Sequence, residues 1–345
     1  MSDFRILHGF EDVWRSPVRP AVWRRETVLR PPPMSDVKAR LSRIVRRAPE
    51  VMVKVAGRTR DPGRLAAHLS YITRNGQLPG EGRDGWPIEG RGEVKDLAED
   101  WAAAGLNDPR RRANTPLSVG VILSMPAGTD ALRLRDAARG FATAMFGDRF
   151  DYVFVLHTDV PTPHIHLTIK AQGDHGERLN PKKADLAAWR LAFAQALRDH
   201  GVEAEATPRR ARGVTRKPEC AAVYRLSERA ARGQGPMPEV LRQRYREAAQ
   251  AAFAGDERAR IWERRTAARQ GQIRTLYMAQ ARLLQASSVP GDRELGAAVE
   301  AFVHDLPPPD SQRLALAREL RALARELRAA NRELARAHGS KDRER

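Results

Sequence analysis

The sequence predicts an α+β fold, in which helices cover one face of an antiparallel-rich central sheet, followed by an all-helical C-terminal region. Three observations lead to this prediction. Short β-branched runs alternate with helical patterns from about residue 50 to 200. Two of these runs are joined by a loop too short for a parallel crossover. Strand signals end near Gly233, after which Ala, Arg, Glu, Leu and Gln dominate.

The individual elements follow from their periodicity. The first strand is expected over 51–55, a β-branched run that ends before Gly57. Three further strands are expected over 118–124, 151–157 and 164–170. Apolar residues at three- and four-residue spacing predict helices over 63–74, 93–105, 130–146 and 181–200. The loop 158–163 makes the last two strands antiparallel neighbours.

The chain divides by composition into three parts. Residues 1–48 are basic and proline-rich, and are expected to form an extended or disordered arm. Residues 49–220 form the folded domain, and 221–345 form the helical region. Residues 316–338 repeat every seven positions, with Leu316, Leu320, Leu323 and Leu327 at coiled-coil spacing. This seam can pack within the chain, on a partner, or in a homodimer.

The charge balance points to a polyanionic partner. Lys and Arg number 61 against 43 acidic residues, a net charge of +18. Nucleic acid is the first candidate and an acidic membrane surface the second. Cys220 is the only cysteine, which excludes an intramolecular disulfide framework and a cysteine zinc cluster. With neither an apolar run of membrane-spanning length nor a signal-peptide layout, we expect a cytoplasmic protein without stable membrane insertion.

The densest chemistry lies in residues 157–166. His164 and His166 are two apart on a strand, so both imidazoles point to one face, and antiparallel pairing brings His157 alongside them. Three neutral imidazoles without a thiolate suit a divalent ion such as Mn²⁺, Zn²⁺, Co²⁺ or Ni²⁺ with open positions for substrate. Asp159 in the intervening loop is a candidate to orient a ligand by accepting from its second ring N–H, or to act as a base.

The segment His-Thr-Asp-Val-Pro-Thr-Pro-His-Ile-His at 157–166 resembles the three-histidine motif of HUH nicking endonucleases, in particular plasmid mobilisation and conjugation relaxases of the T-DNA border nuclease type. Residues 68–76 are similar to the tyrosine motif of that family, 124–129 to its second motif, and 210–213 to its closing basic turn. These segments come in the order of the family and cover roughly residues 50–220. Thr162 departs from the motif, where a polar Asn or His is more usual.

The resemblance implies roles for individual residues. Tyr71 would be the nucleophile, Ser124 would help hold the DNA strand, and Asp159 would orient a ligand or act as a base. The metal would be held by His157, His164 and His166, with Mg²⁺ or Mn²⁺ the favoured ions and Zn²⁺, Co²⁺ or Ni²⁺ as alternatives. Tyr71 is flanked in sequence by Arg58, Arg60, Arg64 and Arg74. Candidate DNA contacts are His68, Arg74, Lys170, Arg210 and Arg212.

The expected function is that of a relaxase that nicks one strand at an origin of transfer through a 5′-phosphotyrosyl intermediate. Single-stranded or origin-of-transfer DNA would be its partner. Accessory relaxosome proteins and a coupling protein or type IV secretion system are further expected partners, and the protein could be translocated with the DNA. Two alternatives stay open: a rolling-circle replication initiator with the same chemistry, and a non-catalytic DNA-binding or assembly protein.

Overall fold

The computed structural model describes residues 4–15, 34–216, 219–254 and 259–341. The chain forms two compact units. One consists of Trp14–Thr207 and is called the sheet unit below. The other joins Met1–Val13 to Pro208–Arg345 and is called the helical unit. The sheet unit thus begins before residue 49 and ends before 220, the limits expected for the folded domain.

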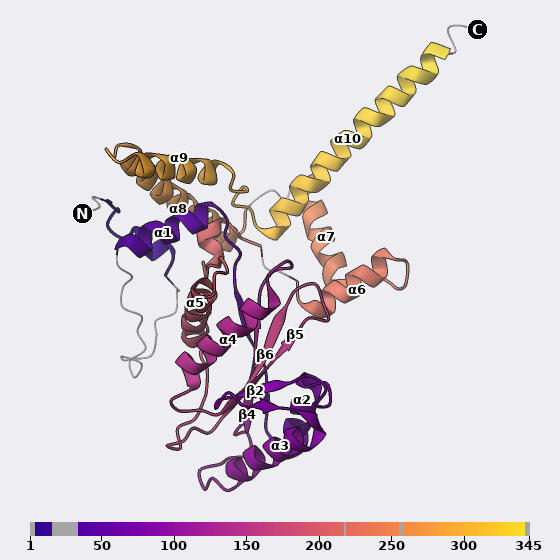
Figure 1. Ribbon diagram of the computed structural model, residues 1–345. Coiled ribbons are helices and arrows are strands. Elements are labelled where there is room, and N and C mark those ends of the chain that lie inside the picture. The colour runs from indigo at the N-terminus through magenta and orange to yellow at the C-terminus, as the bar shows by residue number, and fades with distance from the viewer. Residues whose placement is uncertain (1–3, 16–33, 217–218, 255–258, 342–345) are drawn as a thin grey trace. The chain divides into compact units, whose positions relative to one another are not determined.

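A six-stranded sheet organises the sheet unit (Figure 1). Its strand order is β1-β4-β6-β5-β2-β3, and each neighbouring pair is antiparallel. The strands are β1 Met52–Thr59, β2 Gly80–Gly82, β3 Pro87–Ile88, β4 Ser118–Ser124, β5 Tyr152–His157 and β6 His164–Lys170. The expected antiparallel-rich sheet is confirmed. The short strands β2 and β3 were not expected, because their Gly- and Pro-rich segments carry no β-branched run.

Helices cover both faces of the sheet, rather than one. α4 (Ala131–Phe146) and α5 (Lys183–Asp199) supply Phe141 and Phe193 to the larger core, where Tyr152 and Phe154 of β5 also lie. Because side chains alternate along a strand, Val153 points to the opposite face. There it packs with α2 (Pro62–Ile72) and α3 (Gly90–Leu106) in a second core.

Part of the proline-rich arm is folded. In the sheet unit, α1 (Met34–Val45) buries Val37, Leu41 and Ile44, which recur at helical spacing. Arg43 of this helix donates to Glu205 at 3.0 Å. In the helical unit, the 3₁₀ turn η1 (Phe10–Val13) packs Phe10 edge-on against Tyr277. The expectation of an extended or disordered arm is therefore wrong for these segments; residues 16–33 lie outside the described residues.

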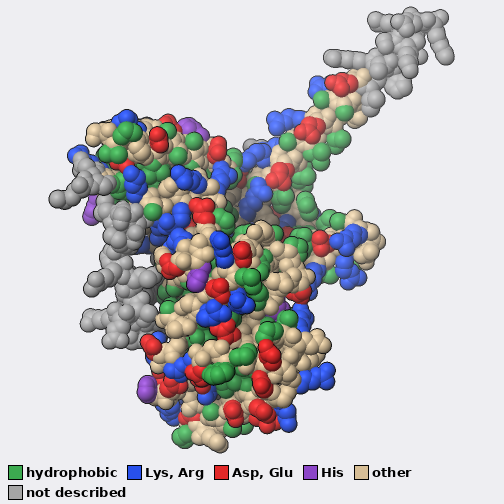
Figure 2. Space-filling model, viewed as in Figure 1, with side chains coloured by type: hydrophobic (Ala, Val, Ile, Leu, Met, Phe, Trp, Pro, Cys, Tyr) green, Lys and Arg blue, Asp and Glu red, His purple; other side chains and the backbone are tan. Residues whose placement is uncertain are grey.

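The described part of the helical unit contains no strand. Its elements are η1, η3 Arg209–Arg212, α6 Ala221–Ala231, α7 Glu239–Phe253, α8 Ile261–Gln285, α9 Pro290–His304 and α10 Gln312–Lys341. Within it, α8 packs on α9 and the first part of α10 on α7. Further along α10, Leu323 and Leu327 of the heptad seam are exposed. Figure 2 shows hydrophobic, acidic and basic side chains mixed along this helix. Among the described residues, no helix is both long and apolar enough to cross a membrane.

Candidate active site

Three histidines meet on the sheet face that α2 covers. His157 and His164 stand directly opposite each other on β5 and β6, and His166 follows two residues along. One ring nitrogen from each residue lies within 4.8 Å of the other two. His157 and His166 are buried, and His164 is half-buried. The expected convergence of the three imidazoles is therefore present in the geometry.

Hydrogen bonds and burial prepare these rings to bind a cation. The Nε2–H of His157 donates to the carbonyl of Ile72 at 2.7 Å, and the Nδ1–H of His164 donates to that of Thr162 at 3.1 Å. A lone pair is thereby left on the other nitrogen of each ring. Burial, reinforced by the neighbouring His157 and His164, lowers the pKa of His166 to about 4. Neutral imidazoles with fixed tautomers are the donor set that a divalent transition-metal ion requires.

Helix α2 carries Tyr71 to the histidines. The side chain of Asp61 caps the helix by accepting from the amide of Arg64 at 2.9 Å, and Pro62 occupies the first turn. From there the helix runs back along the sheet, so its last turn reaches the histidine end. Tyr71 is 57% exposed as a residue, and its ring lies edge-on to that of His166, with centroids 6.0 Å apart. A solvent-accessible phenol thus lies beside the three histidines that are the candidate metal ligands.

The turn after α2 fixes an arginine over that phenol. Arg74 has a φ of +52°, a left-handed conformation that is uncommon for a non-glycine residue, and Gly76 follows with a φ of +79°. The guanidinium carbon of Arg74 lies 5.5 Å from the centroid of the Tyr71 ring. The same guanidinium forms an ion pair with Asp159, whose Oδ1 lies 3.9 Å from Nδ1 of His157. Arg74 and Asp159 therefore link the tyrosine to the histidines.

Two further residues of the sequence prediction lie nearby. Ser124 ends β4 directly opposite His164 and is buried. The Nε2 of His68 is hydrogen-bonded to Oγ1 of Thr168 at 2.9 Å, and burial lowers the pKa of the imidazole. His68 thus has a partner in the sheet, and this geometry favours a positioning role over the DNA contact that was expected.

Other expected contacts do not join the cluster. Lys170 lies at the opposite end of β6, where its Nζ pairs with Asp151 at 3.2 Å. Arg58 and Arg60 follow β1 to that same end, because Met52 rather than Thr59 pairs with Ser124. Arg210 and Arg212 belong to η3 in the helical unit. There Arg210 donates to the carbonyls of Asp12 and Val13 at 3.1 and 3.3 Å.

Sequence reasoning missed three contacts of this site. The carbonyl of Ile72 that orients His157 is a backbone group, which residue type does not reveal. The pairing of His68 with Thr168 depends on how α2 lies on the sheet. Arg74 was picked out as a phosphate contact by location alone, and its pairing with Asp159 went unnoticed. The Asn-Gly that follows Arg74 did signal the tight turn on which this pairing depends.

Comparisons with known proteins agree with this geometry. Residues 83–202 match the family model of the relaxase MobA/VirD2-like nuclease domain. The T-DNA border endonuclease VirD2 of Rhizobium radiobacter is 27% identical over 200 residues, covering 52% of this chain and 47% of the relative. The VirD2 protein of Agrobacterium fabrum is 28% identical over 200 residues, covering 52% and 44%. The chain thus spans less than half the length of these curated relatives.

A solved structure of a MobM relaxase domain bound to origin-of-transfer DNA aligns at 14% identity, covering 45% of this chain and 90% of that one. Its TM-score is 0.32, which does not establish a shared fold. Over residues 83–202 the chain is therefore similar to relaxase nuclease domains, and the structure places a cluster of three histidines on an antiparallel sheet in the same part of the chain. The family model that it resembles is of the MobA/VirD2 type, and T-DNA border endonucleases are among the proteins to which the chain is similar.

Proposed function

We propose that this protein is a metal-dependent DNA relaxase, which nicks one strand at an origin of transfer and becomes joined to the 5′ end through Tyr71. The observation that carries this proposal is the position of an exposed phenol, edge-on to His166 at 6.0 Å and with a guanidinium over its ring. A tyrosine packed only for stability would be buried rather than 57% exposed.

The reaction is a transesterification at the scissile phosphate. The Oη of Tyr71 attacks phosphorus, so that one phosphorus–oxygen bond forms while the bond to the 3′ oxygen breaks. The phenolic proton passes to solvent, and the 3′ oxygen leaves as a hydroxyl after taking up a proton. Because the phosphodiester bond is exchanged rather than hydrolysed, the strand can later be resealed.

His157, His164 and His166 would hold the divalent ion, with Mg²⁺ or Mn²⁺ the first candidates. When bound, such an ion supplies Lewis-acid charge that polarises the phosphate and offsets charge in the transition state. Arg74 contributes positive charge beside the phenolate. Asp159 holds Arg74 in place, and Ser124 at the end of β4 is a candidate contact for the strand next to the cut.

The helical unit is the candidate docking element for relaxosome proteins or for the coupling protein of a secretion system. Its exposed seam on α10, including Leu323 and Leu327, has the spacing of a helical partner surface, and a homodimer is one way to cover it. The nuclease chemistry of the sheet unit does not depend on this assignment.

The test is a nicking assay on supercoiled plasmid carrying the DNA that flanks the gene, with Mn²⁺ or Mg²⁺. The wild-type protein should give open circles with protein covalently attached at the 5′ end. Tyr71→Phe should give neither product, whereas the matched variant Tyr224→Phe, at another exposed tyrosine, should nick normally. Equal nicking by Tyr71→Phe, or nicks without attached protein, would exclude the mechanism.

A further inference from the structure

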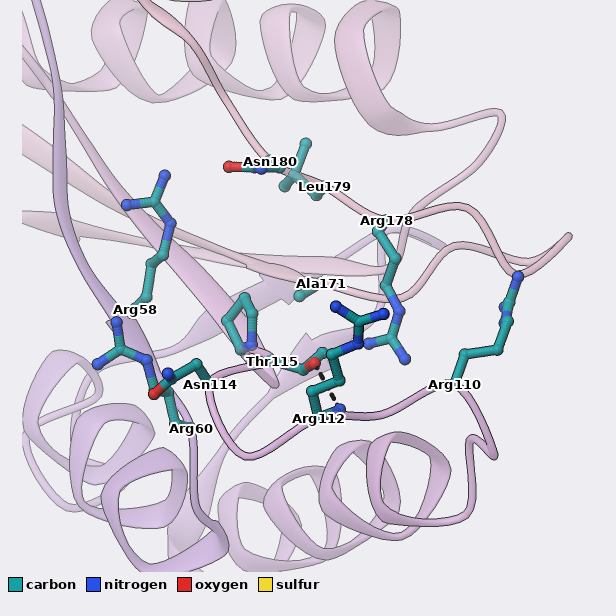
Figure 3. A pocket seen from close by; sticks show the side chains of 11 residues that line it. Arg58, Arg60, Arg110, Arg112, Asn114, Thr115, Ala171, Arg178, Leu179 and Asn180 are labelled. Carbon is teal, nitrogen blue, oxygen red and sulfur yellow. Dashed lines mark hydrogen bonds between the residues drawn. The ribbon is translucent and has the colours of Figure 1, made fainter.

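An arginine-lined pocket of about 540 Å³ lies in the sheet unit, away from the histidines (Figure 3). The arginine pocket, as it is called below, has five guanidinium groups in its lining, those of Arg58, Arg60, Arg110, Arg112 and Arg178. Figure 3 shows Arg58 and Arg60 on one side and Arg112 with Arg178 on the other.

Positive charge in this pocket is mostly uncompensated. Asp108 accepts from Arg110 and Arg178, and so neutralises part of their charge. Among the described residues, the guanidinium groups of Arg58, Arg60 and Arg112 have no hydrogen-bond or ion-pair partner. Several like charges held at one place repel one another, which costs stability unless an anionic ligand binds them. The volume is in the range of ligand sites and exceeds what a single small anion needs.

The pocket wall is built from fixed backbone. Residues 112–115 form a closed turn, in which the amide of Arg112 donates to Oγ1 of Thr115 and the amide of Thr115 returns a bond to Arg112, both at 2.9 Å. Nη2 of Arg111 donates to the carbonyl of Arg60 at 2.8 Å, so this turn is tied to the end of β1. The arginines thus stand on a preorganised frame, which lowers the entropic cost of binding.

Strand register sets the spacing between the two sites. Ala171, which lines the pocket, follows His166 by five residues at the end of β6. At about 3.4 Å per residue, the pocket lies roughly 17 Å along the sheet from the histidines. Ala171 and Leu179, which line the pocket, also belong to the larger core, so the pocket reaches round the end of the sheet from the face that carries the histidines.

We propose that the arginine pocket is a second DNA subsite, which binds the phosphodiester backbone of the substrate strand at a distance from the phosphate that Tyr71 attacks. This inference rests on the proposed function, since it takes DNA as the substrate. The pocket supplies affinity and fixes the register of the strand without reading bases. Guanidinium groups suit this task because they bind phosphate oxygens in a bidentate manner.

The test measures binding of a fluorescent oligothymidylate by anisotropy across a salt series, in a Tyr71→Phe background that cannot cleave. The triple variant Arg58→Gln, Arg60→Gln, Arg112→Gln removes the three unpaired charges. Each lost phosphate contact reduces the salt slope of a single strand by about 0.7, so the slope should fall by about 2. The same change weakens binding roughly a hundredfold at about 0.1 M salt.

Two matched variants control for net charge and folding. Replacing Arg133, Arg135 and Arg149 by Gln removes the same charge from exposed or half-exposed positions in or just after α4, and should change the slope little. Lysine at 58, 60 and 112 keeps the charge and should retain the slope. An unchanged slope in the glutamine triple, or an equal loss in the α4 variant, would overturn the proposal.

Competition identifies the ligand class. Polyglutamate that displaces the oligonucleotide as well as unlabelled DNA of equal charge would overturn the DNA assignment in favour of an acidic protein partner. Failure of this subsite is also distinguishable from failure of the nicking mechanism. A wild-type protein that nicks, with a salt slope insensitive to the arginine pocket, refutes only the subsite. If the glutamine triple variant lowers the salt slope but the wild-type protein never nicks DNA, only the relaxase mechanism is refuted.

Discussion

Replacement of Arg74 by glutamine separates the chemistry of the site from its stability. The guanidinium carbon is 5.5 Å from the ring centroid of Tyr71. At an effective dielectric constant of about 20, a unit charge at that distance stabilises a phenolate by about 3 kcal/mol. Since Arg74 and Asp159 are 39% and 51% exposed, solvent screens part of this energy. We therefore expect Arg74→Gln to nick roughly ten- to a hundredfold more slowly.

The same variant should fold normally. An ion pair as exposed as Arg74–Asp159 contributes only about 0.2–1 kcal/mol to stability. Glutamine and arginine bear the same backbone cost at a φ of +52°, so the turn after α2 is not a confounding factor. The control is Arg64→Gln, which breaks the exposed pair with Asp61 on the same helix. It should leave the nicking rate unchanged.

Single-turnover nicking with excess protein, at saturating DNA, measures the relevant rate, and thermal unfolding checks the fold. A rate within twofold of wild type would refute the assignment of Arg74 to the reacting phenol. So would an equal slowing in Arg64→Gln, since this would make the effect one of net charge. Asp159→Asn tests the link between Tyr71 and the histidines. It should slow nicking less than Arg74→Gln does, because Arg74 keeps its charge and loses only its ion-pair partner.

The remaining predictions concern metal binding, the buried pair under α2 and the helical unit. His166→Ala should abolish Mn²⁺ binding in calorimetry while leaving oligonucleotide affinity intact, because it removes one of three ring donors. Thr168→Val should destabilise the sheet unit by about 1–3 kcal/mol in chemical unfolding, because it leaves half-buried His68 without its partner. Burial opposes ionisation of Glu263, but hydrogen bonds from Arg313, Ser311 and the Arg260 amide outweigh it and lower its pKa to about 2. A carboxyl group whose pKa is lowered by folding stabilises the fold at every pH above its pKa in the unfolded chain. The stability of the helical unit should therefore fall as the pH drops from about 4.5 to 2. Glu263→Gln should remove that pH dependence and cost about 3–5 kcal/mol at neutral pH.

Much of the sheet could be predicted because local signals and global topology agree. The apolar run in residues 152–156, the alternation in 164–170 and the short loop between them predict antiparallel pairing, so the meeting of His157 with His164 could be expected from the sequence. Helix α1 was missed because prolines and arginines around it obscured the spacing of Val37, Leu41 and Ile44.

Contacts between distant segments were beyond such reasoning. Arg58 and Arg60 are close to Tyr71 in sequence, which predicts that they flank it. In the structure α2 reverses the chain direction, which carries Tyr71 to one end of the sheet and leaves Arg58 and Arg60 at the other. A partner for Lys170 likewise depends on Asp151, which enters from β5's preceding turn. Electrostatic partners of this kind are set by packing, which residue type alone does not encode.

The carbonyl of Ile72 accepts a hydrogen bond from the ring of His157, one of the three candidate metal ligands, and Ile72 is the residue next to Tyr71. One rigid turn of helix therefore aligns the nucleophile and locks a ligand tautomer at the same time. A displacement of this turn would disturb the position of Tyr71 and the tautomer of His157 together. A change in cation affinity would therefore report a change in the position of the nucleophile. Amide hydrogen exchange in α2 should accordingly slow when the cation binds, even with no DNA in solution.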